Sequence, residues 1–200
     1  MSELHAVAHK MVEKGKGILA ADESTPTCTK RFASINTDST TESRNFYRNM
    51  LFTTEDIEKY ISGIILFDET FHQSELSSGM KFPEYLTSKN ILPGIKVDQG
   101  LEDFSPYEKL TIGLDGLSER LEKYYSLGAK FAKWRAVITP GDSIPTDDCI
   151  LANAKNLAKY AKKCQQANLV PIVEPEVLMD GAHTIDESFD ITSRTLNMVF

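Results

Sequence analysis

Lysine, arginine and glutamate side chains at two places in this chain have the types and spacing needed for carbonyl chemistry. Lys133 and Arg135 lie near the end of one short apolar run, and Glu174 and Glu176 follow another. Side chains two positions apart on a strand point to the same face, so the members of each pair share a direction and both pairs can face one cavity. A lysine beside carboxylates favours amine addition to a carbonyl, with proton transfer by the acids.

Three further apolar runs also end in charged residues. The residues are Asp22, then Asp68 with Glu69, then Lys96 with Asp98. A charge where a strand returns to water is common and needs no functional explanation. Five runs that end in this way favour a shared site, because lysine and glutamate facing a dry core are costly unless they are paired or functional.

The runs predict buried strands, and the segments between them predict helices. The expected strands are 18–21, 63–67, 92–97, 131–135 and 169–173, and the expected helices are 3–14, 117–125 and 147–164. Continuous apolar strands that alternate with helices are typical of a parallel sheet covered on both faces, which is either doubly wound or closed as a barrel. Pro171 cannot donate to a sheet and fits best at the start of its strand.

The end of the chain bears on the size of the domain. Phe189, Ile191, Thr195 and Met198 predict a helix after Asp186, and Val199 and Phe200 end it without a capping signal. The predicted strand ends recur about every 38 residues, so an eight-unit barrel would need roughly 115 more. We therefore expect residues 1–200 to form a single barrel domain that is truncated at its C-terminus, with about the first five strand–helix units present.

The composition indicates which binding partners and which cell compartment to expect. The 200 residues carry 22 Lys and Arg against 29 Asp and Glu, a net charge of −7, which argues against broad binding to nucleic acid or to a membrane surface. The three cysteines are widely spread and form no C-x-x-C pair, which favours a reducing compartment. No apolar signal core opens the chain and no run approaches the ~20 residues of a membrane span, so we expect a cytoplasmic protein.

Weaker motifs have simpler interpretations. The string from Gly15 to Ala20 matches a dinucleotide fingerprint but precedes a strand instead of following one. His5 and His9 are spaced to hold zinc, but no third ligand is near and a solvated surface is favoured. Lys30 and Arg31 could hold a phosphate or lie on a helix face, and composition does not decide between these.

Five longer strings together resemble one known family. They are GKGILAADEST at 15–25, GIKVDQG at 94–100, GLDGLSER at 113–120, FAKWR at 131–135 and VPIVEPE at 170–176. Over essentially the whole chain the sequence resembles class I fructose-1,6-bisphosphate aldolase. The resemblance implies a (β/α)8 TIM barrel that reversibly cleaves fructose 1,6-bisphosphate to dihydroxyacetone phosphate and glyceraldehyde 3-phosphate through a lysine Schiff base. It implies no metal and no cofactor, and a homotetramer for the full-length protein.

The resemblance also implies roles for residues within these strings and beside them. Asp22 would orient and polarise the substrate, Lys133 would assist proton transfers, Glu174 would act as acid and base, and Glu176 would support that network. The implied substrate and phosphate ligands are Ser24, Lys30, Arg31, Lys96 and Arg135.

The family's Schiff-base lysine belongs on the sixth strand, beyond residue 200, so we expect this chain alone to be inactive. Two alternatives stay open. Lys133 could itself form the Schiff base, as in transaldolase-like lyases, or the chain could be a non-catalytic piece with a binding or structural role.

Overall fold

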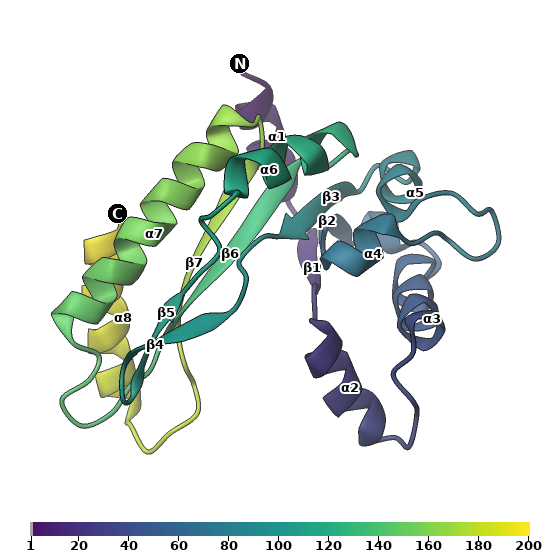
Figure 1. Ribbon diagram of the computed structural model, residues 1–200. Helices are drawn as coiled ribbons and strands as arrows, with labels where there is room; N and C mark the ends of the chain where they lie inside the picture. Colours follow the sequence, from purple (N-terminus) through teal and green to yellow (C-terminus); the bar gives the residue numbers. More distant parts are fainter. Residues whose placement is uncertain (1) are drawn as a thin grey trace. The chain divides into compact units, whose positions relative to one another are not determined.

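The computed structural model describes residues 2–200 and places them in two compact units (Figure 1). The first unit holds residues 2–96, Lys123–Ala132 and Asn168–Val170, and the second holds Val97–Glu122, Lys133–Ala167 and Pro171–Phe200. The strands are β1 (Gly17–Ala21), β2 (Ile61–Leu66), β3 (Leu92–Lys96), β4 (Leu101–Ser105), β5 (Glu108–Thr111), β6 (Phe131–Ile138) and β7 (Val170–Val177). The helices are α1 (Glu3–Met11), α2 (Thr25–Ala33), α3 (Thr41–Phe52), η1 (Ile57–Lys59), α4 (Asp68–His72), α5 (Phe82–Ser88), α6 (Leu117–Ser126), α7 (Asp147–Gln166) and α8 (Ile185–Val199).

The five predicted strands form one sheet in the order β1-β2-β3-β6-β7. Strand β1 pairs in parallel with β2, and β2 pairs in parallel with β3, with Ile64 opposite Pro93. The order follows the chain without a reversal, whereas a doubly wound sheet reverses its order at a switch point. The topology is therefore that of a partial α/β barrel, and the expectation that residues 1–200 form a single domain stays a prediction.

Apolar side chains on the strands form the core of the first unit. Ile64, Leu66 and Ile95 are fully buried, and Phe131 at the start of β6 packs over Gly94. A Cβ atom added at Gly94 would lie 2.2 Å from the Phe131 ring, a distance that no side chain tolerates. Glycine in the GIK string is therefore required by the packing of β3 against this ring.

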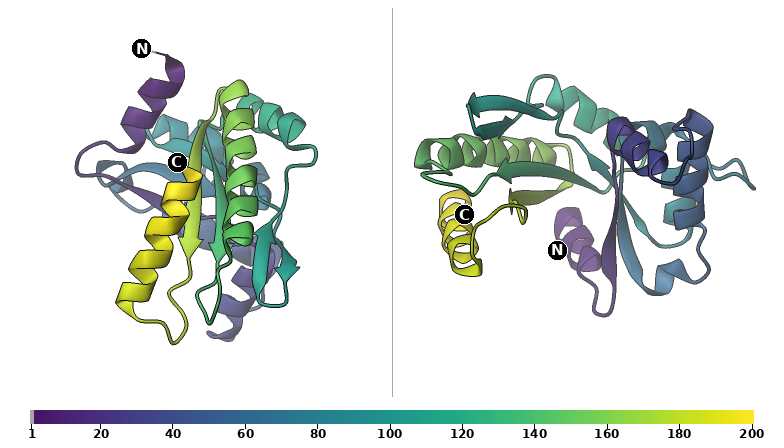
Figure 2. Two further views of the ribbon diagram at one scale, coloured as in Figure 1. Left: turned by 90° about the vertical axis from the view of Figure 1, so that its left-hand side faces the viewer. Right: turned by 90° about the horizontal axis from the view of Figure 1, so that it is seen from below.

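In the second unit, α7 is the main covering helix. Thr146 caps it by accepting a hydrogen bond from the Cys149 amide at 3.2 Å, and the Tyr160 ring packs 5.5 Å from the Trp134 ring of β6. Helix α8 lies beside α7, as both views of Figure 2 show, and the β4–β5 hairpin packs on α7 as well. The helix predicted over 147–164 is confirmed as α7, which buries Ile150, Leu157 and Cys164.

Several details differ from the expectations. The first helix was expected over 3–14 but ends at Met11, and Val12 beyond it is 74% exposed. Strand β6 continues to Ile138 and β7 to Val177, so the charges expected at their ends lie within the strands. The reason in β6 is that residues 136–138 are also apolar and buried. No helix within residues 2–200 is long and apolar enough to cross a membrane.

Candidate active site

Strands β6 and β7 bring four of the predicted site residues together in two ion pairs. The Lys133 ammonium lies 3.4 Å from a Glu174 carboxylate oxygen, and the Arg135 guanidinium pairs with Glu176. The two-residue spacing on each strand gives both pairs the same direction. Both cations thus lie on β6 and both acids on β7, and each cation pairs with an acid on the neighbouring strand.

The two pairs differ in their access to solvent. The side chain of Lys133 is 11% exposed and that of Glu174 is 33% exposed, whereas Arg135 and Glu176 are more open. The backbone amide of Arg135 also donates to the Asp98 carboxylate at 3.4 Å. A nearly buried ammonium beside a half-open carboxylate can exchange protons with a molecule that approaches the acid.

The other predicted residues lie in the first unit. Asp22 directly follows β1 and is buried, and Lys96 is the last residue of β3 and is half-buried. Ser24 is the N-cap residue of α2, where its hydroxyl lies 3.0 Å from that of Thr27. Lys30 and Arg31 are exposed on α2. These residues therefore sit at strand ends and on the helix that follows the first strand.

Four side chains form a cluster that the sequence did not indicate, and we call Glu23, Arg31, Tyr47 and Arg48 the Glu23 cluster. One Glu23 oxygen accepts hydrogen bonds from Arg31 and from the Tyr47 hydroxyl, the latter at 3.0 Å. The other oxygen lies 3.0 Å from Arg48, whose guanidinium also donates to the Glu23 carbonyl at 2.9 Å. Burial, together with the bond to Glu23, raises the pKa of Tyr47, so its hydroxyl stays a donor at neutral pH.

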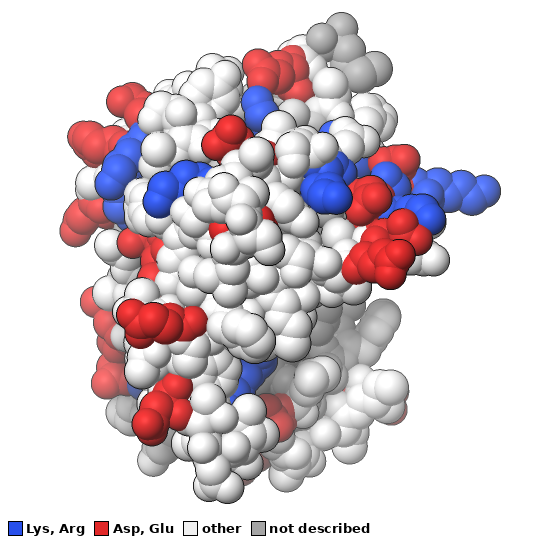
Figure 3. Space-filling model, turned by 90° about the vertical axis from the view of Figure 1, so that its right-hand side faces the viewer, with Lys and Arg blue, Asp and Glu red and all other residues white. Residues whose placement is uncertain are grey.

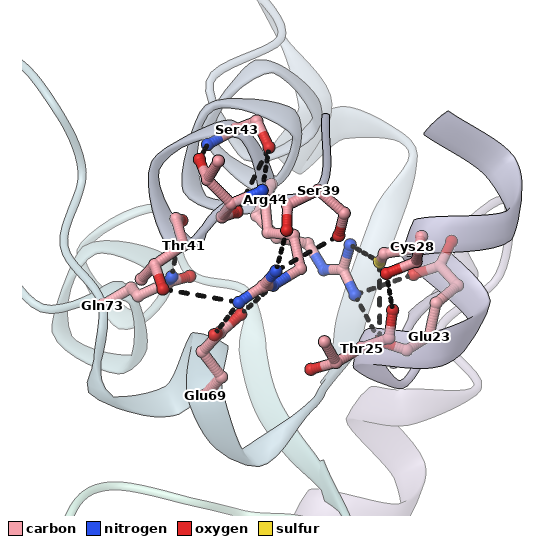
Figure 4. Close-up of polar contacts among 12 residues, drawn as sticks. Glu23, Thr25, Cys28, Ser39, Thr41, Ser43, Arg44, Glu69 and Gln73 are labelled. Carbon is pink, nitrogen blue, oxygen red and sulfur yellow. Dashed lines mark hydrogen bonds and ion pairs between the residues drawn. The ribbon is translucent and has the colours of Figure 1, made fainter. Parts of the chain in front are cut away.

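A second arginine, one turn earlier on α3, makes a separate set of contacts. Arg44 donates to both oxygens of Glu69 at 2.7 and 2.6 Å and to the Ser39 carbonyl at 2.9 Å. The hydrogen bonds to Glu69 raise the pKa of the Arg44 guanidinium. Figure 4 shows Arg44 facing Glu69, while Glu23 and Cys28 lie on the other side of the network. The spacing of Arg44 and Arg48 by four could have indicated one helix face, but not that the face is buried.

Charges on the outer surface are mixed. Figure 3 shows acidic and basic side chains interspersed on one face, and among the described residues drawn there no broad basic area forms. His5 and His9 are both exposed. Within residues 2–200, no three histidine, cysteine or acidic side chains gather as a set of metal ligands.

The strands of the sheet follow the order of the chain, and a lysine of β6 pairs with a glutamate of the adjacent strand β7. These features define a protein of the α/β-barrel class. A family model described as fructose-bisphosphate aldolase class-I matches residues 3–200, and the chain belongs to that family.

Relatives with this name are similar along the whole chain. A probable fructose-bisphosphate aldolase class 1 from Xanthomonas axonopodis is 52% identical over 100% of this chain and 60% of its own length. Fructose-bisphosphate aldolase 1 of Toxoplasma gondii is 52% identical over 99% of this chain and 55% of its own length. A solved structure of the Plasmodium falciparum aldolase, in complex with TRAP and a small molecule inhibitor, has a TM-score of 0.95 at 49% identity, covering 98% of this chain and 58% of that one. The chain thus spans little more than half the length of these relatives.

Proposed function

We propose that these residues form part of the active site of an enzyme that reversibly cleaves fructose 1,6-bisphosphate to dihydroxyacetone phosphate and glyceraldehyde 3-phosphate. The observation that carries the proposal is the Lys133–Glu174 pair, with its ammonium nearly buried and its carboxylate half-open. Membership of the aldolase family supports it. The lysine that forms the Schiff base is proposed to lie beyond residue 200, in a barrel of eight strand–helix units.

Glu174 has the geometry for the proton transfers of imine formation. Addition of an amine to the substrate ketone gives a carbinolamine, and its hydroxyl leaves as water only when a proton is supplied. Glu174 supplies that proton and recovers it when water returns in the reverse step. Lys133 holds the Glu174 carboxylate in place at 3.4 Å. Arg135 and Glu176 join the same two strands two residues further along.

Bond cleavage then requires a base for the C4 hydroxyl proton, and Glu174, which is a carboxylate once the carbinolamine hydroxyl has left as water, accepts that proton and later returns it to C3. The electron pair of the C3–C4 bond moves toward the iminium, the aldehyde product leaves, and C3 is later protonated. Asp22 orients the reacting carbons, and Lys133 stabilises negative charge that develops there. Ser24, Lys30, Arg31, Lys96 and Arg135 are proposed to bind the substrate and its distal phosphate, which needs local cations in a chain of net charge −7.

The test is a chimera that joins this chain to the portion of the Xanthomonas axonopodis relative outside the match. We expect it to cleave fructose 1,6-bisphosphate, and borohydride with dihydroxyacetone phosphate to trap an adduct on a lysine of the added portion. An adduct on Lys133 would support the transaldolase-like alternative. No adduct and no cleavage would support a binding or structural role.

Glu174→Gln and Glu176→Gln in that chimera form a matched pair on one strand face. Glu174→Gln should slow imine trapping by about 100-fold, because the amide keeps the shape but transfers no proton. Glu176→Gln should have a much smaller effect. Equal trapping rates for Glu174→Gln and the parent would make Glu174 a structural partner of Lys133.

Two further properties belong to the proposal. A cytoplasmic location is supported by Cys28, Cys149 and Cys164, which are free and buried, as expected in a reducing compartment. A homotetramer is proposed for the full-length protein from the family resemblance alone, and sedimentation of the chimera would test it.

A further inference from the structure

Glu23 is a shared counterion, and its partners differ sharply in burial. The Arg48 side chain is 2% exposed and that of Glu23 is 10% exposed, whereas the Arg31 side chain is 59% exposed. Arg48 also donates to the Glu23 backbone carbonyl and to the Cys28 side chain, with its guanidinium 3.4 Å from Cys28 Sγ. Of the two guanidinium groups on Glu23, only that of Arg31 can move toward an incoming ligand.

The net charge of the Glu23 cluster favours binding of an anion. Two arginines face one carboxylate, so the Glu23 cluster carries a net positive charge when Tyr47 is neutral. When Arg31 moves away, Glu23 keeps the ion pair with Arg48 at one oxygen and the Tyr47 hydrogen bond at the other, so the buried carboxylate is not left without a partner.

We propose that Glu23 is a positioning residue that docks Arg31 and releases it to a phosphate dianion, and that Arg48 sets the strength of this docking. The proposal rests on the proposed function, because it assigns Arg31 to the phosphate of the substrate. When Arg48 neutralises Glu23, Arg31 is held weakly and is available. Without Arg48, Glu23 depends on Arg31 and competes with the phosphate for it.

The test uses the 200-residue chain and inorganic phosphate, with chloride at the same ionic strength as the reference. Binding is followed through the NMR signal of the Arg31 Nε–H group. We expect Arg48→Met to weaken phosphate binding roughly tenfold, the equivalent of one strong charged contact. Arg44→Met is the matched control, since Arg44 is also buried on the same helix but contacts Glu69 instead of Glu23. It should leave phosphate binding within about twofold of the parent.

The decisive variant combines Arg48→Met with Glu23→Gln. If Arg48 acts by neutralising Glu23, its removal has little effect once that carboxylate is gone, so the double variant should bind phosphate at least as tightly as the parent. A general collapse of α2 and α3 would not be rescued in this way. Arg48→Lys and Tyr47→Phe, which weaken the hold on Glu23 without emptying the site, should each reduce affinity about threefold and replace Arg48→Met if it does not fold.

Three results would overturn the inference: an Arg31 signal that ignores phosphate, equal losses for Arg44→Met and Arg48→Met, or no rescue by Glu23→Gln. Loss of cleavage by the parent chimera, with this pattern of phosphate binding intact, would instead remove the proposed function and leave the docking of Arg31 in place.

Discussion

The Glu23 cluster and the β6–β7 ion pairs both join arginine or lysine to glutamate, yet they do so in different surroundings. Arg48 and Glu23 have side chains 2% and 10% exposed, whereas Arg135 and Glu176 are 40% and 36% exposed. Buried charges depend on their partners, because neither can return to water without disrupting the fold. Half-open charges keep part of their hydration and remain available to a ligand.

The same residue types therefore stabilise the fold where they are buried and remain available for chemistry where they are half-exposed. Arg44 and Arg48 hold α3 against the segments around Glu69 and Glu23, and they satisfy backbone carbonyls as well as carboxylates. The strand pairs instead point their charges in one direction. Substitutions of the buried arginines of α3 should therefore lower the free energy of unfolding more than substitutions in the β6–β7 ion pairs. The β6–β7 residues should matter more for reaction of the substrate.

The largest loss of stability is expected for Arg48→Met. The substitution leaves Glu23 buried with its main partner removed, which should lower the free energy of unfolding by about 3–5 kcal/mol. Urea unfolding followed by circular dichroism measures the change, and Arg44→Met should give a loss of similar size. A loss below about 1 kcal/mol for Arg48→Met would mean that Glu23 is hydrated once Arg48 is removed. The two regions would then not differ in the way proposed.

Glu108 tests whether a buried carboxylate with neutral partners behaves in the same way. It is 3% exposed and accepts hydrogen bonds from the Thr146 amide at 2.7 Å and from the Ser105 hydroxyl at 3.1 Å. Burial acts to raise the pKa of Glu108, but the hydrogen bonds from Thr146 and Ser105 outweigh it and lower the pKa. The stabilisation is therefore fully present above the ordinary glutamate pKa and is lost as pH falls through the folded value.

Glu108→Gln should cost about 2 kcal/mol at pH 7, since a neutral amide is the weaker acceptor. The difference from the parent should shrink as the pH is lowered, which urea unfolding across a pH series would measure. Glu102→Gln, on the exposed face of the same hairpin, is the control and should change little. A constant difference at all pH values would mean that the charge on Glu108 does not contribute.

A smaller effect is expected for Lys133→Met. Glu174 is 33% exposed and regains hydration when the ammonium is removed, so the free energy of unfolding should fall by about 1 kcal/mol or less. The same urea assay measures it. A loss as large as that of Arg48→Met would show that the β6–β7 pairs are part of the structural core, and the contrast between the two regions would fail.

The smallest change in stability should follow Arg31→Met. Its side chain is 59% exposed, and exposed ion pairs contribute about 0.2–1 kcal/mol. Lys30→Met, at the neighbouring exposed position, is the control, and thermal unfolding of both should remain close to the parent. A marked loss for Arg31→Met alone would mean that Arg31 holds the helix in place and is not free to bind phosphate.

Local patterns in the sequence predicted the sheet strands and part of the helices. A helix was predicted over 147–164, and α7 occupies this stretch, with Thr146 capping its first turn and with Leu157 and Cys164 buried. The short helices α4 and α5 and the β4–β5 hairpin were not predicted, because their apolar positions are too few to show a period. Where β6 and β7 end was also missed, since the burial of residues 136–138 depends on what packs over them.

The sequence by itself determined which residues of β6 and β7 share a face, because the two-residue period of a strand is a local property of the backbone. It could not determine that Glu23, which precedes α2, meets Arg48, which lies 25 residues later on α3. That contact exists only when α2 and α3 pack together, and the same packing decides that Arg48 is buried while Arg31 is exposed. Burial sets the strength of a charged contact, so the energetic difference between these two arginines arises from the tertiary structure.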